Sequence, residues 1–260
     1  MTNLINYNFT NCFIVFKNIF YLSIRIFFLF YTAPVFNSIY FNIKMKILLS
    51  IIISLVIFQS FPILNFSIFS LTGEYILFKQ ILIGILLGFS INLIFFITNI
   101  SGEIFSFQTS LSILNFFDES VMLRSSVMSH LLNILLILLF LSLDGHLWVL
   151  STIIQSFYFF PMNFNFLNIK IFFSIIKFFN LIFISGIHLI LPIIIILFCM
   201  NIYLCFLNKF TPQLSIFSIG FSIINFIGLL SFFVFLFPIF FFLNNYLNKI
   251  YLSILNIYFK

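Results

Sequence analysis

Long stretches without any charged residue restrict the fold of this chain more than any other feature. Two of them, residues 178–208 and 210–248, are each longer than the roughly 20 apolar residues that a helix needs to cross a bilayer. Residues 47–73 and 80–102 are also free of charge. Only 6% of all residues are charged, whereas a soluble domain carries about 25%. The chain is therefore predicted to be an integral membrane protein.

The apolar runs predict helices rather than the strands of a barrel. Barrel strands alternate polar and apolar residues over about 10 positions, and runs such as "HLLNILLILLFLSL" (130–143) do not alternate. We expect an all-α integral membrane protein with about six long apolar helices. Their expected ranges are 12–33, 45–64, 78–100, 126–143, 178–207 and 214–243. Residues 147–177 are ambiguous and could form a half-helix or an interfacial segment.

The sequence offers little for catalysis, metal binding or nucleic-acid binding. It has no Walker A loop, HExxH or GxSxG motif. Asp144 and His146 are the nearest approach to a catalytic pair, but metal sites usually need three or more protein ligands. A helix end is the favoured interpretation, with Gly145 breaking the helix and Trp148 at an interface. The basic residues are scattered, so no nucleic-acid partner, no cofactor and no enzyme activity are expected.

The run "GILLG" places Gly84 and Gly88 one turn apart on one helix face. Without side chains at these positions, the backbone of a neighbouring helix can approach closely. Tight helix packing is the expected role, although this spacing alone is a weak signal.

The stretch "SGEIFSFQTSLSILNFFDES" (101–120) is unusually polar for this chain. It holds Glu103, Asp118 and Glu119 of only five acidic residues. A second polar interruption, residues 208–213, joins two very apolar segments and predicts a helical hairpin with Pro212 at its tip.

Several motifs, in order along the chain, resemble the FliR/SctT family of the type III protein export gate. They are "TAPVF" (32–36), "QILIGILLGF" (80–89), "GEIFSFQTSLS" (102–112), "FFD" (116–118), "GHLW" (145–148) and "LNKFTPQLSIFSIGF" (207–221). The resemblance covers roughly residues 25–245. The sequence departs from the family pattern at a few positions: His130, Lys209 and Asp144 replace Arg, Arg and Asn, while Glu119 and Ser222 each replace Pro.

The resemblance implies a subunit of a channel for unfolded flagellar export substrates. In this family one copy joins FliP and FliQ subunits in a helical spiral in the bacterial inner (cytoplasmic) membrane, as part of the flagellar basal body. Residues 1–177 would correspond to a FliP-like part and residues 178–245 to a FliQ-like hairpin. FlhB and FlhA homologues would be further partners. The hairpin loop would line the cytoplasmic entrance, through Asn208, Lys209, Pro212 and Gln213.

The resemblance also suggests why the stretch at 101–120 is polar. In this family the corresponding loop plugs the pore, which carries over to about residues 110–124. The plug would include Ser110, Leu111, Phe116, Phe117 and Asp118. Ser101 and Gly102 would end the preceding helix, and Gly102, Glu103 and Gln108 would form the base of the loop. The alternative is a plain cytosolic loop with its acids on a solvated face.

Three other functions stay open from the sequence. The injectisome counterpart has the same fold and mechanism but another cargo. A secondary transporter of a small solute would need buried charged partners near the bilayer midplane, of which the helices hold few. An integral membrane enzyme is the least favoured, because no catalytic set is apparent.

Overall fold

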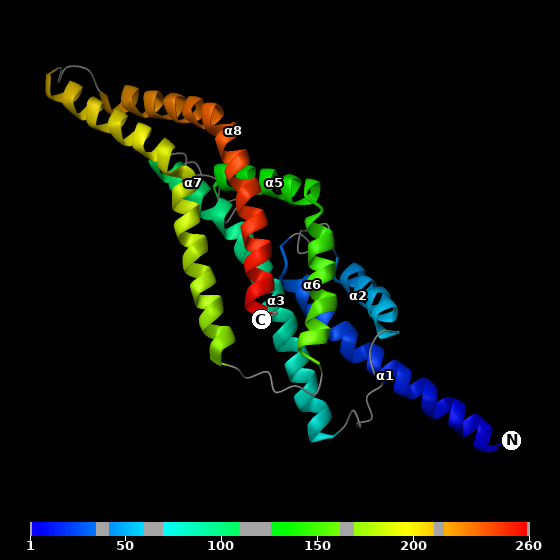
Figure 1. Ribbon diagram of the computed structural model, residues 1–260. Helices are drawn as coiled ribbons and strands as arrows, with labels where there is room; N and C mark the ends of the chain where they lie inside the picture. The colour runs from blue at the N-terminus through cyan, green and yellow to red at the C-terminus, as the bar shows by residue number, and fades with distance from the viewer. Residues whose placement is uncertain are drawn as a thin grey trace. The chain divides into compact units, whose positions relative to one another are not determined.

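The structure is a computed structural model that describes residues 2–34, 42–59, 70–109, 126–161, 169–210 and 216–258 (Figure 1). All regular structure within these ranges is helical, which confirms the predicted all-α fold. The helices are α1 (Thr2–Thr32), α2 (Ile43–Phe58), α3 (Leu71–Gln108), α5 (Val127–Ser142), α6 (Gly145–Phe159), α7 (Ile169–Phe210) and α8 (Ile216–Tyr258).

Helices α3 and α8 extend beyond the C-terminal ends that the sequence predicts, whereas α2 ends earlier, at Phe58. The expected ends of α3 and α8, at residues 100 and 243, were placed where polar residues appear, yet the helices continue to Gln108 and Tyr258. Polar residues are tolerated because their hydroxyls bond within the helix: Ser106 Oγ donates to the Glu103 carbonyl at 2.8 Å. Pro238 lies inside α8. Residues 147–177, which were ambiguous, supply most of α6 and the start of α7.

In the part of the chain that the structure describes, four helices are long and apolar enough to cross a membrane. The candidate spans are Ile14–Thr32, Leu71–Gln108, Phe179–Phe210 and Ser222–Ile250. A fifth is possible if α5 and α6 act together as one broken span. The described helices therefore form a multi-pass membrane protein.

Contacts divide the chain into two units. The first unit contains residues 1–92, 147–175 and 254–260, and the second contains residues 93–146 and 176–253. The split near residue 177 that the sequence suggests is of another kind, because it separates a FliP-like part from a FliQ-like part. It rests on resemblance to two partner families and not on contacts within the chain, and it stays a prediction.

The core of the first unit contains a buried arginine that links three helices. Arg25 on α1 is only 1% exposed. Its guanidinium donates to Gln80 Oε1 on α3 at 2.7 Å, and to the carbonyls of Ser156 and Phe160 at 2.9 and 2.8 Å. These carbonyls lie at the C-terminal end of α6, where the helix dipole is negative. The Ser156 carbonyl also accepts from the Phe160 backbone N–H at 3.0 Å, so Arg25 is its second donor. Arg25 therefore caps α6 from another helix.

The corner between α5 and α6 belongs to the second unit up to His146. Asp144 has a φ of 54°, in the left-handed region that Asp and Asn adopt more readily than most residues. The helix end expected here is confirmed, but the residue that turns the chain is Asp144 rather than Gly145. Gly145 starts α6, and a Cβ at this position would lie 2.5 Å from the Phe140 ring. A larger residue at this position would require the Phe140 ring to move.

Candidate functional site

The predicted site residues fall partly outside the described residues. Residues 110–125 include every predicted plug residue: Ser110, Leu111, Phe116, Phe117 and Asp118. Pro212 and Gln213 of the hairpin loop are also outside. The described ones are Gly84, Gly88, Gly102, Glu103, Gln108, Asn208 and Lys209. The structure therefore describes the segments that flank the predicted plug, not the plug itself.

The prediction that Ser101 and Gly102 end the helix is wrong. Helix α3 passes through both residues and continues to Gln108. A single glycine costs a helix only about 1 kcal/mol relative to Ala, which packing readily outweighs. Ser101 Oγ also donates to the Thr98 carbonyl at 3.1 Å, so its polar group stays inside the helix.

Glu103 ties α3 to the first turn of α5. Its Oε1 accepts hydrogen bonds from the Ser126 backbone N–H at 2.7 Å and the Ser129 hydroxyl at 3.2 Å. Ser126 is the N-cap of α5, and its hydroxyl accepts from the Ser129 N–H at 3.2 Å. In a capping box, a glutamate of the same helix bonds the N-cap N–H. Here a glutamate from another helix does so, and its charge suits the positive end of the α5 dipole.

Gly102 allows this close approach of α3 and α5. A Cβ on Gly102 would overlap the Ser129 Cα and lie 2.5 Å from the Ser129 N. One turn away, Thr98 Oγ1 donates to Asn133 Oδ1 at 2.5 Å, and Asn133 Nδ2 donates to Asn99 Oδ1. We call this polar contact between α3 and α5 the α3–α5 seam. It consists of Thr98, Asn99, Gly102, Glu103, Ser126, Ser129 and Asn133.

The end of α3 is also held in place. A Cβ on Gly228 of α8 would lie 2.5 Å from Thr109 Cγ2, and the rings of Phe105 and Phe232 are 5.5 Å apart. Thr109 lies six residues beyond Glu103, which is about 9 Å along a helix axis. The chain thus leaves α3 and re-enters at Ser126 within a short distance, with both ends fixed by packing.

Gln108 has no described hydrogen-bonding role at this end of α3. Its Oε1 is buried and accepts no hydrogen bond from the described residues. Its expected part in the base of the loop therefore stays a prediction, whereas Glu103 bonds the residue at which the chain re-enters.

Gly84 and Gly88 seat α1 of the same chain against α3. A Cβ on Gly84 would lie 2.5 Å from the Arg25 carbonyl oxygen and 3.0 Å from Phe28 Cβ. A Cβ on Gly88 would overlap the Thr32 hydroxyl and lie 2.7 Å from the Leu29 carbonyl oxygen. Gln80, one turn before Gly84, shares this face and bonds Arg25. The glycine pair thus brings the partner of Arg25 within hydrogen-bonding distance.

Alanine at either glycine is expected to destabilise the protein. Gly84→Ala and Gly88→Ala should each lower the free energy of unfolding by about 1–3 kcal/mol, because the added methyl forces the α1 backbone to move. The measurement is the thermal unfolding midpoint in detergent, which should fall by roughly 2–4 °C per kcal/mol.

Gly186 on α7 provides a matched control. A Cβ there would meet its nearest atom, the Ile97 carbonyl oxygen, at 3.3 Å. Gly186→Ala should lower the midpoint less than either of the other two variants, because its added methyl meets a milder contact and Ala favours the helix by about 1 kcal/mol over Gly. Equal midpoints for all three variants would show that the glycine pair has no special packing role.

Asn208 and Lys209 lie in the last turn of α7, because this helix continues to Phe210. Both side chains are exposed, and the charge of Lys209 suits the negative end of the α7 dipole. The predicted loop therefore starts later than the sequence suggested.

Arg25 and the serine pair at the start of α5 were not among the site residues predicted from the sequence. Arg25 is the only charged residue in the range 18–43, and an isolated basic residue in an apolar helix indicates a buried partner. Ser126 precedes an apolar run, which is a helix-start signal. Within the described residues, no three His, Cys, Asp or Glu side chains come together in a group that could hold a metal ion.

Comparison with known proteins identifies the family. A family model described as "Bacterial export proteins, family 1" matches residues 16–250. The flagellar biosynthetic protein FliR of Buchnera aphidicola subsp. Acyrthosiphon pisum (strain APS) is 41% identical over 223 residues, which cover 86% of each chain. FliR of Pectobacterium carotovorum subsp. carotovorum is 40% identical over 212 residues, covering 82% of this chain and 81% of that protein. FliR of Escherichia coli (strain K12) is 35% identical over 210 residues, covering 81% and 80%. Since each match covers most of the sequence, the chain belongs to family 1 of the bacterial export proteins, in which these FliR proteins are its relatives.

Proposed function

We propose that this chain is a core membrane subunit of the flagellar type III export gate. It joins FliP and FliQ homologues in the inner-membrane channel for unfolded export substrates, and residues 110–124 plug the pore. FlhB and FlhA homologues associate with the assembled gate. The loop that begins after Phe210 faces the cytoplasmic entrance. The chain itself carries out no catalysis.

The observation that carries this proposal is the extent of the family match. Residues 16–250 fit the bacterial export family, and relatives named as flagellar biosynthetic proteins align over four fifths or more of the chain. At the coarser level this makes the chain a multi-pass membrane component of the flagellar export apparatus. The flagellar names of these relatives favour the flagellar system over the injectisome counterpart.

The frame around residues 110–125 supports a plug role. The segment begins and ends at positions held by the second unit, through Gly228 against Thr109 and through Glu103 against Ser126. A segment that closes a pore needs ends in fixed positions, because movement of the ends would let water and ions pass.

Purification in mild detergent tests the proposal. The tagged chain should co-purify with FliP and FliQ homologues, identified by mass spectrometry, in fixed ratios across size-exclusion fractions. An unrelated tagged multi-pass membrane protein from the same cells is the control. Recovery of the chain without either homologue would contradict the export-gate assignment, and recovery with injectisome subunits would favour the alternative system.

A further inference from the structure

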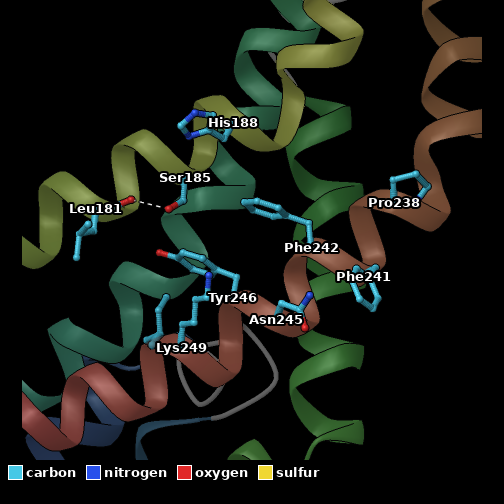
Figure 2. Close-up of a pocket in the computed structure, with 10 residues that line it drawn as sticks. Leu181, Ser185, His188, Pro238, Phe241, Phe242, Asn245, Tyr246 and Lys249 are labelled. Atoms are coloured by element: carbon cyan, nitrogen blue, oxygen red, sulfur yellow. Dashed lines mark hydrogen bonds between the residues drawn. The ribbon is translucent and has the colours of Figure 1, made fainter.

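A cavity of about 650 Å³ opens between α7 and α8 within the second unit (Figure 2). Its volume falls in the range of about 300–1,000 Å³ that is typical of ligand sites. Leu181, Ser185 and His188 line it from α7, and Phe242, Tyr246 and Lys249 line it from α8. Most of the wall is apolar, and a few polar groups gather on it.

The polar groups of this cavity include a cation without a counter-ion. Lys249 is exposed and makes no ion pair or hydrogen bond within the described residues. Among the described residues, the acidic ones are Glu74, Glu103 and Asp144, and none of these three lines the cavity. His188 and Asn245 also line it without a described hydrogen bond, so both can bind a ligand. The charge of the cavity therefore suits an anion.

Tyr246 adds a buried hydroxyl. The side chain is 9% exposed, and its hydroxyl makes no hydrogen bond of standard geometry, although it lies close to the Ser185 hydroxyl. Ser185 itself donates to the Leu181 carbonyl at 2.6 Å. In Figure 2 the Tyr246 side chain extends from α8 toward α7, with its hydroxyl near Ser185. A polar ligand group placed here would satisfy a buried donor that otherwise costs stability.

The cavity also runs from the edge of the membrane spans toward their interior. Lys249 lies at the end of the span Ser222–Ile250, and Leu181 lies near the start of the span Phe179–Phe210. Pro238 lines the other end, eleven residues before Lys249, or about 16 Å along the helix. Half of the hydrocarbon core of a bilayer is about 15 Å thick. The polar end of the cavity thus lies at headgroup depth, and its apolar length matches one acyl chain.

We propose that this cavity binds an anionic phospholipid, with the phosphate against Lys249 and one acyl chain along Phe242 toward Pro238. His188, Asn245 and Tyr246 offer further hydrogen-bonding groups on the cavity wall. A zwitterionic lipid fits less well, because none of the described acidic residues lines the cavity to pair with its ammonium group. This binding does not depend on the proposed export function.

Native mass spectrometry of the full-length protein tests the proposal with three probes: phosphatidylglycerol, phosphatidylcholine with the same acyl chains, and inorganic phosphate. Phosphatidylglycerol should be retained most strongly. Lys249→Ala should weaken its binding roughly tenfold, the size expected for loss of one charge-assisted hydrogen bond. Lys249 is exposed, so this variant should fold normally, which the unfolding midpoint checks.

Lys44→Ala is the matched control, because it removes the same charge from an exposed position at the start of α2. Its phosphatidylglycerol binding should equal that of the wild type. Equal retention of the two lipids, or unchanged binding by Lys249→Ala, would overturn the proposal. Binding of inorganic phosphate as tightly as of phosphatidylglycerol would show a free-anion site, and would overturn it too.

Discussion

Replacement of Arg25 by Met is expected to lower the free energy of unfolding by about 2–4 kcal/mol, because buried acceptors lose their donor. The Phe160 carbonyl and Gln80 Oε1 each accept from the guanidinium. Removing a buried charge that faces no described carboxylate recovers part of the cost of its desolvation, which keeps the loss below the sum of the hydrogen bonds. The thermal midpoint in detergent should fall by roughly 5–15 °C.

Two further variants separate the charge of Arg25 from its geometry. Arg25→Lys keeps the charge but loses the planar fork, which reaches Gln80 and two carbonyls at once, so it should recover only part of the stability. Lys44→Met removes an exposed cation from α2 and should change the midpoint little. If Arg25→Met were as stable as the wild type, the hydrogen bonds by which Arg25 links α1, α3 and α6 would make no net contribution to the free energy of unfolding.

Deletion of residues 112–120 is expected to raise the ion conductance of the assembled gate severalfold. This expectation rests on the proposed function, in which the segment closes the pore. A steric seal works by filling volume and excluding water, so side-chain bulk should matter more than charge. Phe116→Ala combined with Phe117→Ala should raise the conductance partially, and Asp118→Asn should barely change it. Single-channel recording of the reconstituted FliP–FliQ–FliR-type complex measures these differences.

Assembly must be checked alongside conductance, because a misassembled complex leaks for other reasons. The deletion leaves Glu103, Ser126 and Thr109 in place, so co-purification with the FliP and FliQ homologues should persist. A deletion variant that assembles normally and conducts no more than the wild type would show that the segment is not the seal. An open pore in Asp118→Asn alone would indicate an electrostatic latch instead.

The sequence predicted the helices because their apolar runs are long, and it located the glycine pair because its spacing defines one face. It did not identify the helix on which Gly84 and Gly88 pack, since sequence spacing describes one element and not its neighbour. It placed the end of α3 wrongly, because a glycine beside polar residues resembles a helix stop. In the structure, the Ser101 hydroxyl bonds within the helix and Gly102 packs against Ser129 of α5. Neither interaction can be read from the order of residues along the chain.

A role for Glu103 was predicted from the sequence, but the residue that it contacts was not. The sequence indicated a hydrogen-bonding role for Glu103 at the base of the loop, from its family motif. Its partner, the Ser126 backbone N–H, lies 23 residues further along the chain. Arg25 was missed although it is isolated in an apolar run, because its acceptors are mainly backbone carbonyls of α6, and carbonyls have no signature in sequence.

The length of α3 exceeds what a crossing of the membrane requires. Its 38 residues extend about 57 Å, nearly twice the roughly 30 Å thickness of the hydrocarbon core. Even a steep tilt of about 40° uses only about 39 Å of helix to cross that layer. At least about 18 Å of α3 must therefore protrude into the headgroups or the water beyond. Polar side chains at a protruding end incur no transfer cost into lipid, so this part of the chain can keep its hydrophilic character without any shielding from the bilayer.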